Sequence, residues 1–298
     1  MRTIDWIRLT GLAALWGASF LFMRIVVPVL GAVPTAFGRV LLASVGLFAL
    51  LALQRAPLRF NGRLMACLLL GVINSGLPFL MYAMAARSLP AGYSAILNAT
   101  TPLMGVLAGA LFFGEGLSAT KLAGVVTGLA GVSVLTRTGP VTWDATLLAS
   151  VAACLVATAC YGVAGFLTRR WISQRGGLDS RLVALGSQLG AVLFLLPFMA
   201  TQPLAELRPA MGAAPPVVWL ALAGLGSLCT SAAYILYFKL IADVGPVKAL
   251  SVTFLVPLFG VMWGALLLGE AVSLAHAAGG ALIAVALWLV LRPGAAAR

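Results

Sequence analysis

The stretch TTPLMGVLAGALFFGE at residues 100–115 recurs as LVPLFGVMWGALLLGE at residues 255–270. Nine of the sixteen positions are identical at this offset of 155 residues. Biased composition alone would give roughly one or two matches. The same offset pairs Gly71 with Gly226. The chain therefore contains an internal duplication.

The composition places this duplication in a membrane. The 298 residues are 62% hydrophobic and 9% charged, whereas a soluble domain is about 45–50% apolar and about 25% charged. A water-soluble fold could not cover so much apolar surface, but lipid can. We therefore expect an all-α integral membrane protein.

Turn residues divide the chain into ten apolar segments, each close to the roughly 20 residues that a spanning helix needs. The predicted helices are 9–29, 34–54, 64–86, 91–113, 120–137, 146–168, 182–200, 216–238, 245–268 and 274–292.

Loop charge gives the expected orientation. With a cytoplasmic N-terminus, 14 of the 19 Lys and Arg residues fall in inside loops and tails, three in outside loops and two within helices. Basic residues are retained on the cytoplasmic side during insertion. We expect a multi-pass protein of the inner (plasma) membrane with both termini cytoplasmic.

Ten helices and one duplication give five helices in each half. The predicted repeats are residues 1–140 and 141–298. An odd number of crossings inverts the second repeat relative to the first. Inverted repeats recur in transporters, with the substrate site near the midplane between the halves. The sequence thus predicts two inverted repeats around a central cavity.

Several other classes of protein are excluded because the sequence lacks the motifs that they require. None of the three lysines, Lys121, Lys239 and Lys248, follows a glycine, so no Walker A loop is present. His276 is the single histidine and the four cysteines lie in apolar segments, which predicts no metal site and no disulfide framework. We expect no cofactor, no enzyme activity and no nucleic-acid partner. The expected partners are a small-molecule substrate and the lipid bilayer, and the sequence is compatible with a monomer.

The acidic residues bear on energy coupling, which usually requires a carboxylate within the membrane. All seven lie at predicted helix ends or in loops. Uniport or exchange is therefore favoured, and coupling through Glu115 or Glu270 stays open. We interpret these two glutamates first as caps near the start of the next helix.

Neutral polar residues within the predicted helices are candidates for substrate contact, because a neutral polar group facing lipid is disfavoured. Aromatic residues in the same helices add ring surfaces that suit an aromatic solute and can attract an ammonium group. Each has a structural alternative, since Ser and Thr bond their own helix backbone and Tyr and Trp form interfacial belts. The predicted binding residues are Trp16, Ser19, Asn74, Tyr82, Asn98, Thr101, Tyr161, Thr230, Tyr234, Tyr237 and Trp263.

Four further residues are candidates for hinges or gates. Pro102 and Pro257 sit at matching positions in two predicted helices, where each removes a backbone hydrogen bond. Arg24 and Arg39 lie near predicted outer helix ends. They either snorkel to the interface, gate the outer side or attract a carboxylate.

The Trp-Gly-Ala-Ser-Phe of residues 16–20, the in-helix Arg39 and the two Pro-Leu…Gly-Glu blocks resemble the drug/metabolite transporter superfamily, and within it the EamA branch of bacterial exporters. Length and aromatic content resemble the YddG-type amino-acid exporters. The resemblance implies ten helices with both termini inside.

These features predict a secondary exporter of small metabolites, foremost neutral and aromatic amino acids, that works by alternating access without ATP. The alternatives are efflux of cationic drugs or of other metabolites, including sugar phosphates, and a passive channel.

Overall fold

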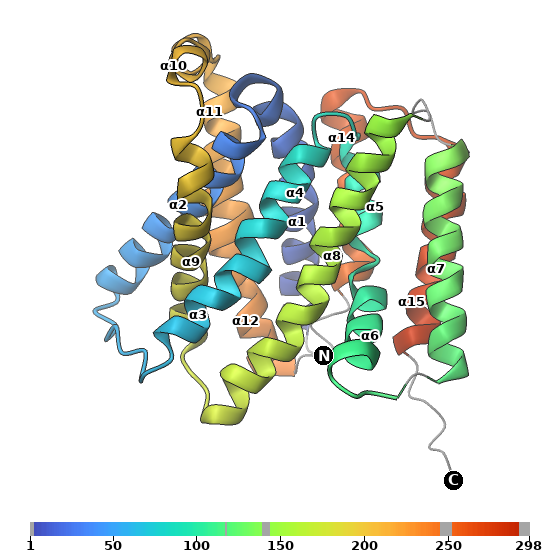
Figure 1. Ribbon diagram of the computed structural model, residues 1–298, viewed down its shortest axis with the longest axis horizontal. Helices are drawn as coiled ribbons and strands as arrows, with labels where there is room; N and C mark the ends of the chain where they lie inside the picture. The colour runs from blue at the N-terminus through green and yellow to red at the C-terminus, as the bar shows by residue number, and fades with distance from the viewer. Residues whose placement is uncertain (1–2, 117, 139–143, 245–251, 292–298) are drawn as a thin grey trace.

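The computed structural model describes residues 3–116, 118–138, 144–244 and 252–291. All regular structure in these ranges is helical (Figure 1). The helices are α1 (Thr3–Leu30), α2 (Ala32–Leu53), α3 (Leu64–Gly71), η1 (Val72–Gly76), α4 (Leu77–Ala85), α5 (Ala91–Asn98), α6 (Thr101–Phe112), α7 (Ala119–Thr138), α8 (Ala145–Trp171), η2 (Ser173–Arg175), α9 (Ser180–Ala200), α10 (Leu204–Ala213), α11 (Pro216–Ala223), η3 (Gly224–Ala232), α12 (Ala233–Val244), α14 (Val252–Leu268) and α15 (Leu274–Leu291).

Seven helical stretches in the described ranges are long and apolar enough to cross a membrane. Three shorter apolar helices, at 119–134, 255–268 and 274–286, fall where further spans are predicted. Large apolar side chains such as Phe48, Met65 and Trp288 are about half exposed or more, as lipid-facing residues would be. The prediction of an all-helical membrane protein is confirmed, and the count of ten spans stays a prediction.

One predicted helix is broken where proline interrupts it. Residues 91–113 form α5 and α6, separated at Ala99–Thr100, with Pro102 in the first turn of α6. Because Pro102 has no N–H, it cannot bond the Asn98 carbonyl. The Thr101 hydroxyl donates to that oxygen instead, at 2.7 Å. Pro257, in contrast, lies inside the continuous helix α14. The two prolines therefore differ in their local structure.

Three elements, η1, η3 and α10, are not predicted from the sequence. Two spans contain π-helical turns, η1 and η3. Shifting η1 by 155 residues gives 227–231, which lies within η3. The segment between the predicted helices 182–200 and 216–238 contains the short helix α10, which includes Pro209 and buries Leu207.

Glycines allow the helices of the two halves to approach closely, and matched glycines do so at matched crossings. A Cβ at Gly17 on α1 would lie 2.9 Å from the backbone N of Gly260 on α14. A Cβ at Gly162 on α8 would lie 2.7 Å from the backbone N of Gly105 on α6. Gly105 and Gly260 are paired by the offset of 155 residues, and Gly17 and Gly162 are paired by an offset of 145 residues that applies nearer the N-terminus of each half.

Matched glycines also make close contacts in the two spans that contain π-helical turns, at Gly71 and Gly226. A Cβ at Gly71, at the end of α3, would overlap the Ser187 carbonyl on α9. A Cβ at Gly226 in η3 would lie 2.6 Å from the Leu42 Cβ on α2. These contacts fix η1 against α9 and η3 against α2, which sets the positions of the polar side chains between the halves.

Candidate site between the two halves

Arg39 carries a charge into the interior of the helix bundle. It lies about 10 Å along α2 from the first residue, at 1.5 Å per residue, and only 5% of the residue is exposed. Its Nε donates to the Thr230 hydroxyl at 2.9 Å. Its guanidinium carbon stands 3.5 Å from the centroid of the Phe79 ring, a cation–π contact. The interpretation of Arg39 as a residue that snorkels from an outer helix end is wrong.

The π-helical turn in η3 explains the position of Thr230. Its hydroxyl donates to the carbonyl of Leu225, five residues earlier, at 2.9 Å. Ser231 does the same to Gly226 at 3.3 Å and also lies 3.1 Å from the Ala43 carbonyl on α2. This geometry leaves the Thr230 oxygen free to accept from Arg39.

A chain of neutral polar groups lies beside this arginine. The Tyr234 hydroxyl is 3.3 Å from both Asn74 Nδ2 and Ser75 Oγ. Ser75 accepts a hydrogen bond from Gln188 Nε2 at 2.9 Å. Gln188 is fully buried, and its Oε1 has no hydrogen-bond partner among the described residues. We call Arg39, Asn74, Ser75, Gln188, Thr230 and Tyr234 the polar centre.

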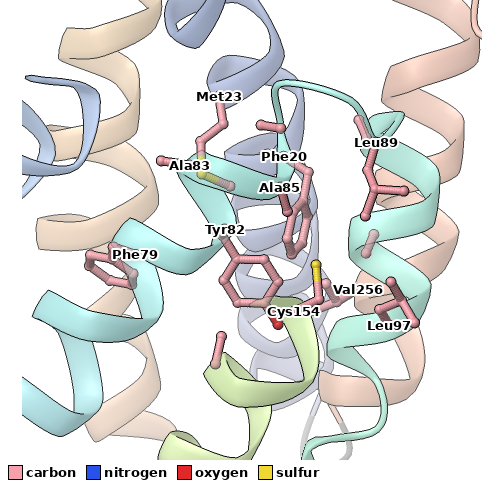
Figure 2. Close-up of a cluster of buried hydrophobic side chains, with 14 of the residues drawn as sticks. Phe20, Met23, Phe79, Tyr82, Ala83, Ala85, Leu89, Leu97, Cys154 and Val256 are labelled. Carbon is pink, nitrogen blue, oxygen red and sulfur yellow. The ribbon is translucent and has the colours of Figure 1, made fainter. Parts of the chain in front are cut away.

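Aromatic rings form a second group. The Tyr82 hydroxyl donates to Asn98 Oδ1 at 2.9 Å. The Tyr82 ring stacks on Tyr161 with centroids 6.3 Å apart and meets the edge of Phe20 at 5.4 Å. Figure 2 shows Tyr82 of α4 beside Phe20 and Cys154. We call Phe20, Tyr82 and Tyr161 the aromatic group.

The two groups adjoin. Tyr161 of the aromatic group and Tyr234 of the polar centre both lie close enough to Arg39 to interact with it electrostatically. Trp16 packs on Tyr237, one turn after Tyr234, with ring centroids 5.2 Å apart. Side chains from both predicted halves thus meet in one region: α1, α2, η1 and α4 on one side, and α8, α9, η3 and α12 on the other.

Three predicted binding residues have their polar groups engaged in other contacts or buried in packing. The Thr101 hydroxyl bonds its own helix backbone, as described above. The Trp263 indole donates to the Ala14 carbonyl at 3.2 Å and stacks on Phe259. Ser19 is buried one turn after Trp16. Thr101 and Trp263 therefore have structural partners that hold α6 and α14 in place.

The sequence predictions do not include Gln188 and Phe79, although both lie in this region. Gln188 is the only amide in the apolar stretch 182–200, which is a signal that could have identified it. Phe79 is one of 14 phenylalanines, and no sequence pattern distinguishes the one that lies under Arg39.

Arg24 and Glu270 form a contact away from the polar centre. Glu270 Oε1 accepts from Ala91 N at 2.9 Å, and its Oε2 accepts from Gly92 N at 3.4 Å. Glu270 therefore caps α5 rather than α15, the next helix, so that detail of the prediction is wrong. Arg24 Nε lies 3.6 Å from Glu270 Oε1, and Arg24 Nη1 donates to the Ala86 carbonyl at 2.9 Å.

Glu115 has the same backbone hydrogen bond as Glu270, but its carboxylate caps no helix among the described residues. Glu115 N and Glu270 N donate to the carbonyls of Gly109 and Gly264, at 3.0 and 3.1 Å. The glycine before each glutamate has a φ near +70°, which favours glycine. Glu115 is exposed, and its carboxylate accepts no hydrogen bond within the described part of the chain.

A helical membrane fold with a buried polar and aromatic region between two sets of helices is an arrangement suited to solute transport. Residues 6–137 and 148–292 each match the EamA-like transporter family, and the chain belongs to this family. The protein is a multi-pass membrane transporter and not an enzyme.

Two curated relatives align over most of their lengths. The chain is 29% identical over 275 residues to "Uncharacterized inner membrane transporter YedA" of Escherichia coli K12, covering 89% of this chain and 83% of the relative. It is 28% identical over 277 residues to "Protein PecM" of Dickeya dadantii, covering 92% and 88%. A solved crystal structure has the same fold, with a TM-score of 0.64 at 20% identity over 97% of this chain and 96% of the other.

Proposed function

We propose that the protein is a secondary exporter of small metabolites, foremost neutral and aromatic amino acids. The observation that carries this proposal is the chemistry of the region between the halves. Hydrogen-bonding amides and hydroxyls lie next to aromatic rings, and a single buried arginine is the charged group among them. Such groups suit a solute with one polar end and an apolar or aromatic side chain.

We infer that transport proceeds by alternating access between two inverted five-helix repeats, residues 1–140 and 141–298. Three observations support this mechanism. The family matches the chain twice in succession. The π-helical turns η1 and η3 occupy matched positions. Matched glycines make matched crossings between the halves. Two similar halves can exchange conformations, so that a cavity between them opens to one side and then to the other.

The proposed location is the inner membrane with both termini cytoplasmic. The name of the YedA relative supports this membrane, and the distribution of Lys and Arg supports the orientation.

The rival substrates require different chemistry. A site for cationic drugs usually offers a buried carboxylate. Among the described residues, the groups that interact electrostatically with Arg39 are tyrosines and a cysteine, with no carboxylate. Sugar phosphates would call for several buried basic residues, since each phosphate carries up to two charges. The polar centre contains one.

Uptake into proteoliposomes tests the substrate class. The full chain is reconstituted, and saturable uptake of labelled L-phenylalanine, L-leucine, glucose 6-phosphate and a cationic dye is compared with that in empty liposomes. We expect saturable uptake of the two amino acids. Uptake confined to the sugar phosphate or to the dye would contradict the proposal.

A further inference from the structure

We propose that Arg39 binds the carboxylate of the substrate, so that a carboxylate, rather than an ammonium group, is the feature that the polar centre requires. This inference rests on the proposed function and narrows it to carboxylate-bearing substrates. A guanidinium removed from water is unfavourable unless an anion and further hydrogen bonds compensate the lost hydration.

No protein carboxylate compensates Arg39 within the described residues. Its neighbours are Tyr161, Cys229 and Tyr234, all neutral at physiological pH. The acidic side chains of Asp5, Asp179 and Glu270 pair elsewhere. Among the residues that the structure describes, the groups in contact with the Arg39 guanidinium are the Phe79 ring and the Thr230 hydroxyl.

The contacts of Arg39 also orient its guanidinium. Nε donates a hydrogen bond to the Thr230 hydroxyl, and the guanidinium carbon lies over the Phe79 ring. The two Nη nitrogens make no hydrogen bond to the described residues. A guanidinium held in this way offers its Nη groups to a carboxylate, which they can bind with two parallel hydrogen bonds.

A second buried group lacks a partner in the same region. Gln188 is fully buried, and its amide bonds Ser75 through one atom and leaves Oε1 unsatisfied. An unpaired buried acceptor is unfavourable. It could accept one hydrogen bond from a neutral or ammonium N–H of a substrate. As an uncharged group, it would favour an ammonium less strongly than Arg39 favours a carboxylate.

Four matched compounds separate these requirements. L-Phenylalanine carries both groups, phenylpyruvate keeps the carboxylate without the ammonium, and phenethylamine and L-phenylalaninamide lack the carboxylate. Binding is measured on the full chain in detergent as a ligand-dependent rise in melting temperature. We expect L-phenylalanine and phenylpyruvate to raise the melting temperature and the other two to have no effect at equal concentration.

The variants Arg39→Gln and Arg39→Lys test the residue itself. In Arg39→Gln we expect affinity for both carboxylates to fall at least about tenfold, because a buried charge pair has lost one partner. Arg39→Lys should recover part of the affinity, since it keeps the charge without the planar fork. Arg181→Gln, which changes an arginine paired with Asp179 at the start of α9, is the control and should bind like the original chain.

The outcomes distinguish this inference from the proposed function. If Arg39→Gln lowers the melting temperature of the unliganded protein but retains the preference for carboxylates, Arg39 is only structural and the inference fails. Binding of phenylpyruvate but not of L-phenylalanine would contradict amino-acid export and leave the carboxylate site supported. Binding of the amine or the amide as tightly as the acids, or of none of the four compounds, would overturn the inference.

Discussion

Hydrogen bonds between single side chains join different helices of the bundle. The Arg39–Thr230 bond links α2 to η3, and the Tyr82–Asn98 bond links α4 to α5. Each is a side-chain pair in a low-dielectric interior, where a satisfied hydrogen bond specifies one arrangement and an unsatisfied group is costly. The residues that form the polar centre therefore also determine how the helices around it pack.

The Tyr82–Asn98 bond can be tested by a double-mutant cycle. Tyr82→Phe keeps the ring that stacks on Tyr161 and removes only the hydroxyl. We expect each of Tyr82→Phe and Asn98→Ala to lower the free energy of unfolding by about 1 kcal/mol, with the double variant losing less than the sum. The measurement is unfolding of the purified variants in detergent. Strict additivity would show that the bond contributes nothing.

The sequence predicted some of these residues and could not predict their partners. Trp16, Tyr82, Tyr161 and Tyr234 are predictable because their rings, in apolar helices that also carry neutral polar groups, suit contact with an aromatic or zwitterionic solute. The pairing of Asn74 with Tyr234 spans 160 residues, and it depends on helix crossings that no local pattern encodes. The sequence places Arg39 near a predicted helix end and does not show that Thr230 of η3 lies against it.

At the scale of elements, helix type and helix crossing were the features that the sequence left undetermined. The apolar segments and their breaks gave most helix positions to within a few residues. The π-helical turns were missed because one extra residue in a turn changes neither composition nor period clearly. Their matched positions, each beside a glycine crossing, indicate that they belong to the duplicated architecture.

The crossing of α3 and α9 should tolerate no side chain at Gly71. An added Cβ would overlap the Ser187 carbonyl, so we expect Gly71→Ala to destabilise the protein by roughly 1–3 kcal/mol. Gly280→Ala is the matched control, because a Cβ there has no atom within 4 Å. Thermal unfolding in detergent measures both. Equal melting temperatures of the two variants would be inconsistent with the crossing described above.

The cap on α5 gives a second comparison between matched positions. Glu270 accepts hydrogen bonds from the first N–H groups of α5, whereas Glu115 is exposed. We expect Glu270→Ala to lower the free energy of unfolding by about 0.5–2 kcal/mol, the usual range for a lost N-cap. Glu115→Ala should stay within about 0.5 kcal/mol of the original chain. A larger loss for Glu115→Ala than for Glu270→Ala, in the same unfolding assay, would refute this assignment.

For the whole molecule, the arrangement of charge indicates how transport is driven. No carboxylate contributes to the polar centre among the described side chains, so no acidic proton carrier lies there. On the proposed mechanism, in which no proton binds during the cycle, amino-acid uptake into proteoliposomes should change less than about twofold when a pH gradient is imposed. The measurement is the initial rate with and without the gradient. Strict dependence on the gradient would show coupling and direct attention to Glu115 and Glu270.

Counterflow tests the central claim most directly, because it separates a carrier that alternates between two sides from an open channel. Proteoliposomes are loaded with excess unlabelled L-phenylalanine and diluted into a trace of labelled L-phenylalanine. An alternating-access exporter should accumulate the label transiently above its equilibrium level, since the internal substrate returns the site to the outside. A monotonic approach to equilibrium with no overshoot, at a concentration where uptake is measurable, would contradict the account.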